Sequence, residues 1–195
     1  MARPDRCIIV GSGPSAAGFK CPDGIAIISV KHTITWLDRA DYWFALDPDA
    51  AVEAMAPPRP GVQYFCAAPE KFALPPHVTR LERVAERGRE PYPRHTAEWW
   101  LWRWHGVRTL CTRVGAVHTG NSAWGALGLA FHLGFRDVLL VGVDGSSAPR
   151  IEGGRPNNLS HLPLLFASAL PQIKLQTVSV MSGIPKTTLA EWLAE

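Results

Sequence analysis

The sequence is poor in cysteine, and its cysteines have no spacing that would bind a metal or staple a small fold. It has only four, none in a C-x-x-C pair or a zinc-type Cys/His cluster: Cys7, Cys21, Cys66 and Cys111. A disulfide framework and a structural zinc site are therefore not expected. A reducing, cytoplasmic compartment is the expected location.

Long apolar runs are also missing. The first one is broken after four residues by a Gly-Ser-Gly turn, and no uninterrupted stretch reaches the ~18 residues of a membrane-spanning helix. We expect neither a leader nor a membrane span. The chain has 195 residues, 47% of them hydrophobic, which suits one folded domain with a sizeable core.

The sequence has no large excess of charge of either sign, and its formal net charge is +3. The basic residues are scattered, except that eight arginines fall between Arg80 and Arg113. Such a balance is compatible with an anionic ligand but gives no specific support for nucleic-acid binding. It leaves homo-oligomerisation open.

Residues 7–15, CIIVGSGPS, read as a buried strand that runs into a turn of small residues. Gly11 and Gly13 would let the backbone approach an anion, and Ser12 and Ser15 add hydroxyl groups. We expect this turn to bind a phosphate or a ribose at the carboxyl end of the strand. The third glycine of the dinucleotide fingerprint is missing, because Ala16 stands in its place, and no Lys-Ser/Thr pair follows.

A second candidate element lies later in the chain. Asn121 or Ser122 would cap a helix that extends to about residue 133, and its N-terminus would carry free N–H groups suited to a phosphate. The apolar strand of residues 137–143 then delivers Asp144 to the same edge of the sheet. The two turns should converge on one ligand.

Alternation of strands and helices predicts the fold class. The strand candidates are residues 6–10, 25–30, 42–46, 62–66, 138–143 and 174–180. We expect a single α/β domain, residues 1–195, with a Rossmann-like, doubly wound, mostly parallel sheet and helices on both faces. A Pro/Arg/Trp-rich insertion is expected at about residues 57–106, either wrapping the sheet edge or forming a lid.

That insertion contains EWWLWRWH, residues 98–105, with half of the chain's eight tryptophans. Alternating Trp and Arg could stack on a base or sugar, dip into a membrane interface, or roof the core and a dimer contact. On a helix Trp99 and Trp102 would share one side, and Trp100 and Trp104 another.

The IIVGSGPS turn together with NSAWGALGLAFHLGFRDVLLVGVDGS resembles the glycosyltransferase family 42 sialyltransferases, and also the MptE-like (6-hydroxymethylpterin) diphosphokinases and phage proteins of the same fold. The resemblance covers the beginning and the second half of the chain. It implies that a nucleotide-activated donor binds at the positions that match the motif: Gly11, Ser12, Gly13, Ser15, Asn121, Ser122, Gly142, Asp144 and Gly145. Asp47, which departs from the family's pattern, could bind a ribose hydroxyl.

The resemblance also implies a catalytic histidine downstream of the G-x-D loop, where His161 is the nearest candidate. His118, which lies beside Thr119 and before that loop, is the competing candidate. Either would deprotonate an acceptor hydroxyl. Two departures are notable. The family's Asn-Pro-Ser turn reads Asp47-Pro48-Asp49 here, and its tyrosine-rich lid is missing. Asp47 and Asp49 also spell a D-x-D pair, which could hold Mg²⁺ or Mn²⁺ or could simply cap a helix.

Three functions follow. The first is a sugar transferase that uses a nucleotide sugar and an acceptor hydroxyl. The second is an MptE-like diphosphokinase in which Asp47, Asp49 and Asp144 would gather Mg²⁺ around a triphosphate. The third is a nucleotide-binding phage accessory protein without catalysis.

Overall fold

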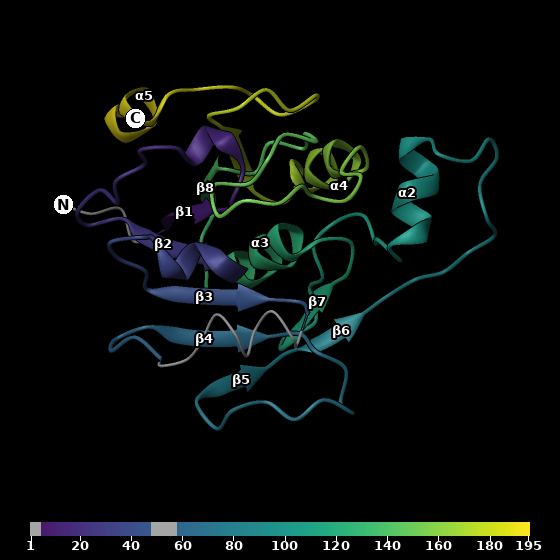
Figure 1. Cartoon of the computed structure of the whole chain (residues 1–195), viewed down its shortest axis with the longest axis horizontal. Coiled ribbons are helices and arrows are strands. Elements are labelled where there is room, and N and C mark those ends of the chain that lie inside the picture. The colour runs from purple at the N-terminus through teal and green to yellow at the C-terminus, as the bar shows by residue number, and fades with distance from the viewer. Residues whose placement is uncertain (1–4, 48–57) are drawn as a thin grey trace.

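A computed structural model describes residues 5–47 and 58–195. These residues form a seven-stranded parallel sheet in the order β5-β4-β3-β2-β1-β8-β9 (Figure 1). Its strands are β1 (Arg6–Val10), β2 (Ala26–Val30), β3 (Tyr42–Ala45), β4 (Gln63–Cys66), β5 (Val78–Arg80), β8 (Asp137–Val141) and β9 (Lys174–Thr177). The predicted α/β fold class with a mostly parallel sheet is confirmed.

The strand sequence explains why both faces of the sheet are covered. Side chains of β1 alternate between two hydrophobic clusters: Cys7 and Ile9 lie in one, and Ile8 and Val10 lie in the other. All four are fully buried, so the strand reads as a continuous apolar run.

Helices lie on both faces of the sheet. The helices α3 (Ser122–His132) and α4 (Leu162–Ala169) contribute to the first cluster. The opposite face carries the short 3₁₀ helices η1 (Pro14–Ala16) and η2 (Lys31–Thr35), and α5 (Leu189–Ala194).

Strand order reverses beside β1. Strands β2 to β5 follow one another on one side, whereas β8 and β9 lie on the other. Such a switch point opens a crevice at the carboxyl ends of the strands, where α/β sheets bind their ligands.

A small second sheet pairs β6 (Glu82–Val84) with β7 (Ala116–His118). The sequence predicts no strand between residues 66 and 138, and this prediction was wrong for β5, β6 and β7. Each has three residues, and β5 and β6 carry charged or polar side chains. They therefore lack the apolar run from which a strand is predicted.

The segment before β7 holds the tryptophan-rich helix α2 (Ala97–Arg103), which Figure 1 shows beside α4 and away from the main sheet. None of its residues is buried. The predicted pairing is confirmed: the rings of Trp99 and Trp102 lie 6.2 Å apart, and Trp100 stacks on Trp104, also at 6.2 Å.

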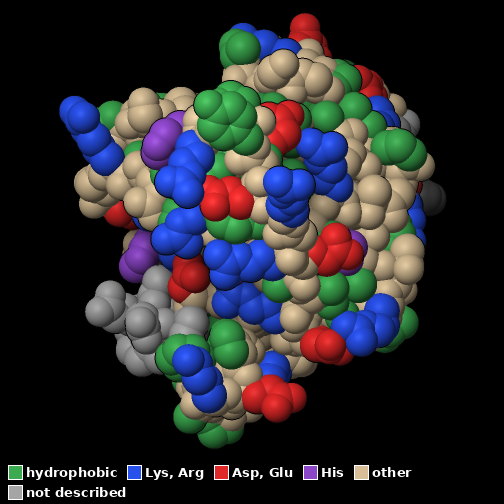
Figure 2. Space-filling model, turned by 90° about the vertical axis from the view of Figure 1, so that its right-hand side faces the viewer, with side chains coloured by type: hydrophobic (Ala, Val, Ile, Leu, Met, Phe, Trp, Pro, Cys, Tyr) green, Lys and Arg blue, Asp and Glu red, His purple; other side chains and the backbone are tan. Residues whose placement is uncertain are grey.

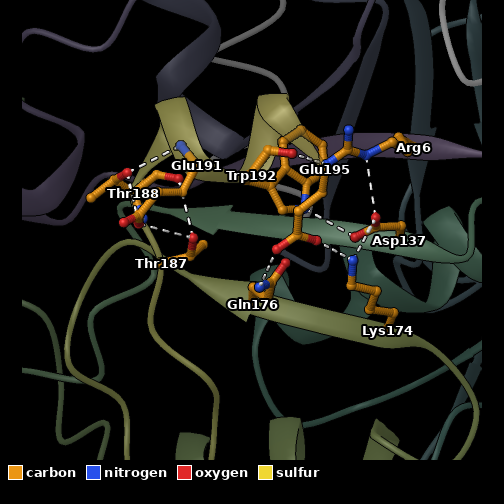
Figure 3. A network of polar contacts seen from close by, with 9 residues as sticks. All are labelled: Arg6, Asp137, Lys174, Gln176, Thr187, Thr188, Glu191, Trp192 and Glu195. Atoms are coloured by element: carbon orange, nitrogen blue, oxygen red, sulfur yellow. Dashed lines mark hydrogen bonds and ion pairs between the residues drawn. The ribbon is translucent and has the colours of Figure 1, made fainter.

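A polar network fastens α5 to the amino ends of β1 and β8 (Figure 3). The buried Asp137 carboxylate accepts from Trp192 Nε1 at 3.0 Å and pairs with Arg6 Nε and Lys174 Nζ, both at 3.2 Å. The Arg6 guanidinium also lies 3.7 Å from the Trp192 ring centroid. This network lies at the edge of the sheet opposite to the crevice.

Within the described residues, no helix is long and apolar enough to cross a membrane.

Candidate functional site

An open cavity of about 240 Å³ lies in the crevice at the strand switch point. It is lined by the segments that follow β1, β2, β3 and β8, by the start of α3, and by the segment that leads into α4. Figure 2 views the molecule from this side and shows Lys and Arg side chains gathered across its centre. The topology therefore brings both predicted turns to one cavity.

The turn after β1 is held against the turn after β8 by backbone hydrogen bonds. Gly11 N–H donates to the Val141 carbonyl and Gly13 N–H to the Gly142 carbonyl, both at 2.8 Å. A Cβ on Gly11 would lie 2.5 Å from the Gly142 oxygen. The glycines thus permit two backbones to touch, and their own N–H groups already have protein acceptors.

Ser15 and Asp144 lock the same two turns together. The Asp144 carboxylate accepts from Ser15 N–H at 2.9 Å and from the Ser15 hydroxyl, which in turn accepts from Gly142 N–H at 2.9 Å. Asp144 and Gly142 line the cavity, as does Gly145, but Ser15 does not. Ser15 therefore acts on the site by holding Asp144.

The loop after β8 also folds over Ser12. Ile151 N–H donates to the Ser12 carbonyl at 2.9 Å, and the Glu152 carboxylate accepts from the Ser12 hydroxyl at 2.8 Å and from Trp36 Nε1 at 2.5 Å. This loop carries Arg150 into the cavity lining.

Three basic side chains, those of Lys31, Arg83 and Arg150, line the cavity. Lys31 pairs with Asp47 at 2.9 Å, whereas Arg83 and Arg150 have no ion-pair partner among the described residues. Guanidinium groups match phosphate oxygens in geometry and charge. The cavity is thus suited to an anion even though the glycine N–H groups are engaged.

The start of α3 adds a further positive end. Asn121 caps the helix, since its side-chain oxygen accepts from Ala123 N–H at 2.8 Å, and Ser122 Oγ accepts from Leu46 N–H at 3.3 Å. Both residues line the cavity. The N-terminal end of a helix of 11 residues favours a negative group nearby.

His161 lies in the cavity lining and is 1% exposed. Its Nε2 lies 3.1 Å from the Gly120 carbonyl, which can only accept, so Nε2 carries the proton and Nδ1 carries the lone pair. Nδ1 is buried without a hydrogen-bond partner among the described residues. Burial lowers the pKa of His161 below its ordinary value of 6.5, and the Gly120 hydrogen bond only partly opposes this.

His118 lies elsewhere. It ends β7, and its Nδ1 lies 2.8 Å from the Thr109 carbonyl in a shallow hollow beside Gln172. It is not among the residues that line the crevice. The structure therefore brings His161, and not His118, to the two turns.

The candidate metal pair is described in part. Asp47 lies in the cavity lining, with its carboxylate on Lys31, and Asp49 lies outside the described residues. Among the described residues, no group of three or more His, Cys, Asp or Glu side chains could hold a metal ion.

Sequence reasoning missed Lys31, Arg83, Arg150 and Trp104 as cavity residues. Lys31 had a usable signal, because it directly follows a predicted strand and so falls at the carboxyl edge. Trp104 belongs to the segment that could stack on a base or sugar, and Arg83 to the arginine-rich stretch, but neither pattern placed its residue at this cavity, because they lie at the end of a short helix and in a three-residue strand.

No family model matches the chain, and no curated protein matches it. A search of solved structures finds a MAf glycosyltransferase from Magnetospirillum magneticum AMB-1, with a TM-score of 0.53 and 15% identity over 96% of this chain. The chain spans 34% of that protein's length. The fold is therefore similar to part of a glycosyltransferase, and at this identity the similarity concerns the fold alone.

Proposed function

We propose that the chain is a nucleotide-binding transferase domain that moves a sugar from a nucleotide-activated donor to an acceptor hydroxyl. The observation that carries the proposal is the convergence of Arg83, Arg150 and the start of α3 on one cavity that also contains His161. The similarity in fold to a glycosyltransferase supports it.

The cationic groups would bind the donor phosphates. Arg83 and Arg150 would neutralise the phosphate oxygens, and the N-terminal end of α3 at Asn121 and Ser122 would add its partial positive charge. These groups stabilise negative charge that grows on the phosphate as the bond to the sugar breaks.

His161 would act as the base. The acceptor oxygen forms a bond to the anomeric carbon, the bond from that carbon to the phosphate oxygen breaks with its electron pair leaving on the nucleotide, and the hydroxyl proton moves to Nδ1. The Gly120 carbonyl holds the imidazole in the tautomer that leaves Nδ1 without a proton. The lowered pKa keeps this nitrogen unprotonated at neutral pH.

Two of the three carboxylates that a diphosphokinase would use make other contacts. Asp47 pairs with Lys31, and Asp144 holds Ser15. We therefore favour sugar transfer over the diphosphokinase reaction, which needs carboxylates free for Mg²⁺.

Thermal unfolding with the mono- and diphosphates of cytidine, uridine and guanosine tests the proposal. A nucleotide at about 100 times its dissociation constant should add about 2.7 kcal/mol to the free energy of unfolding. Arg150→Ala should weaken its binding about tenfold, since it removes a charge-assisted contact to phosphate.

Arg108→Ala is the matched control, because Arg108 is exposed and outside the cavity lining. It should bind nucleotide as the native chain does. If no nucleotide raises the unfolding temperature, or if both arginine variants lose the same affinity, the cavity is not a nucleotide site.

A further inference from the structure

The tryptophan cluster of α2 reaches the cavity through Trp104, which is part of the cavity lining. The ring of Trp104 is not isolated. It stacks on Trp100 with an interplanar angle of 20°, and Trp100 in turn meets the edge of Trp99 at a centroid distance of 4.8 Å. Ring-on-ring packing fixes the orientation of Trp104. Little side-chain entropy would therefore be lost when a ligand stacks on the indole.

The hydrogen bonds of the indole groups also distinguish Trp100 and Trp104 from the other tryptophans. Six of the eight indole N–H groups donate to a protein acceptor: those of Trp36, Trp43, Trp99, Trp102, Trp124 and Trp192. Among the described residues, Trp100 Nε1 is buried without an acceptor, and Trp104 Nε1 has none either. Trp104 thus brings to the cavity an indole ring, whose centroid lies 5.8 Å from the Arg103 guanidinium carbon, and an N–H donor without an acceptor among the described residues.

Trp104 lies at the same end of the cavity as His161. The segment after Trp104 packs on the segment before α3: the Thr119 hydroxyl donates to the His105 carbonyl, and a Cβ on Gly120 would lie 3.3 Å from Gly106 Cα. Gly120 is the residue whose carbonyl holds His161. The indole and the imidazole are therefore connected through the contact between these two segments.

Neutral polar groups accompany the Arg103 guanidinium, which lies over the Trp104 ring, at this end of the cavity. Asn157 and Asn158 line the cavity beside His161, and Asn157 makes no side-chain hydrogen bond within the described part of the chain. Amide side chains, an indole N–H and an imidazole exchange hydrogen bonds with hydroxyl groups, and the negative face of an indole attracts the weakly positive C–H bonds of a pyranose ring. The arginines that suit phosphate are thus joined by groups that suit an uncharged, hydroxyl-rich ring.

We infer that Trp104, backed by Trp100, is the platform on which the acceptor binds, and that the acceptor is a pyranoside whose ring stacks on the indole beside His161. This presupposes the sugar transfer proposed above. It assigns the tryptophan-rich segment to acceptor recognition and leaves the nucleotide to the cationic groups.

Saturation-transfer NMR with a panel of methyl hexopyranosides, recorded with and without saturating nucleotide, tests the inference. Trp104→Ala should weaken pyranoside binding at least tenfold, and Trp104→Phe should weaken it less, because the aromatic face remains. Trp102→Phe is the matched control on the same helix, since Trp102 is not in the cavity lining, and it should bind as the native chain does. Trp104→Leu replaces the alanine variant if the latter does not fold.

The nucleotide-induced rise in unfolding temperature, measured on the same variants, separates the inference from the proposed function. It should be unchanged by Trp104→Ala. The inference is overturned if the native chain binds no pyranoside, if Trp104→Ala binds one equally well, or if Trp104→Ala loses nucleotide binding, in which case the indole stacks on the base. If the native chain binds pyranosides but no nucleotide, this result contradicts the proposed transferase function.

Discussion

At the scale of single residues, the glycines of the first turn have a role that the sequence did not reveal. The motif predicts that Gly11 and Gly13 bring N–H groups to an anion, yet these groups donate to the carbonyls of Val141 at the end of β8 and of Gly142 in the turn that follows. A sequence shows that a side chain is missing, but it does not show whether a ligand or another part of the backbone fills the space. The prediction that the N–H groups of Gly11 and Gly13 bind phosphate is still untested.

Gly13→Ala should lower the free energy of unfolding by about 1–3 kcal/mol, because the added Cβ would lie 2.5 Å from an Asp144 carboxylate oxygen and 2.8 Å from the Gly142 carbonyl oxygen. Urea denaturation measures the change. Gly88→Ala is the control, since a Cβ there meets nothing within 4 Å, and its stability should stay within about 0.5 kcal/mol of the native value. Equal stability of the two variants would contradict the tight fit of the turns.

His161 should make stability depend on pH in a known direction. Its pKa is lowered in the folded protein, so between its unfolded value of about 6.5 and the lower folded value the unfolded chain binds more protons. Stability is therefore lost as the pH falls through this window and regained as it rises.

Urea denaturation at pH 7.5 and pH 5.5 should show a larger loss for the native chain than for His161→Gln, whose amide can still donate to the Gly120 carbonyl and does not titrate. Parallel losses in the two proteins would show that His161 is not held neutral.

At the scale of elements, sequence reasoning succeeded where a strand is long and apolar. The candidates that became β1, β2, β3, β4, β8 and β9 were placed within a few residues of their bounds. The short strands β5 to β7 are held by pairing with neighbours distant in sequence, and no local pattern encodes that. Without β7, the place of the candidate base His118 in the small sheet could not be predicted.

Helix α5 offers an element-scale test far from the cavity. Asp137→Ala would leave the buried Arg6 guanidinium without its carboxylate and Trp192 Nε1 without its acceptor, and should cost about 3–5 kcal/mol. Differential scanning calorimetry would measure the loss.

Glu195→Gln removes only the exposed partner of Lys174 in the same network and should cause no measurable change. If both variants melt like the native chain, the network does not fasten α5. Nucleotide affinity of folded Asp137→Ala should stay native, since Asp137 lies at the opposite edge of the sheet.

At the scale of the whole molecule, the two edges of the sheet differ in how their charged side chains are paired. The amino edge carries Arg6, Asp137 and Lys174, each with an ion-pair partner, and the carboxyl edge carries arginines without ion-pair partners among the described residues. Position in the topology predicted that the two turns would meet. It could not predict the arginines and the indole, because they arrive from β6, from the end of α2 and from a long loop whose course depends on tertiary packing.

The contact between Gly11 and Gly142 also limits how this fold can change in evolution. Each residue occupies the space into which a side chain of the other would grow, and Gly142 additionally has φ +68°. Enlarging one cannot be compensated by altering the other, since neither has anything left to remove. Relatives that keep this packing should therefore show glycine at both positions without covariation, and this invariance would reflect folding even in lineages that have lost any ligand.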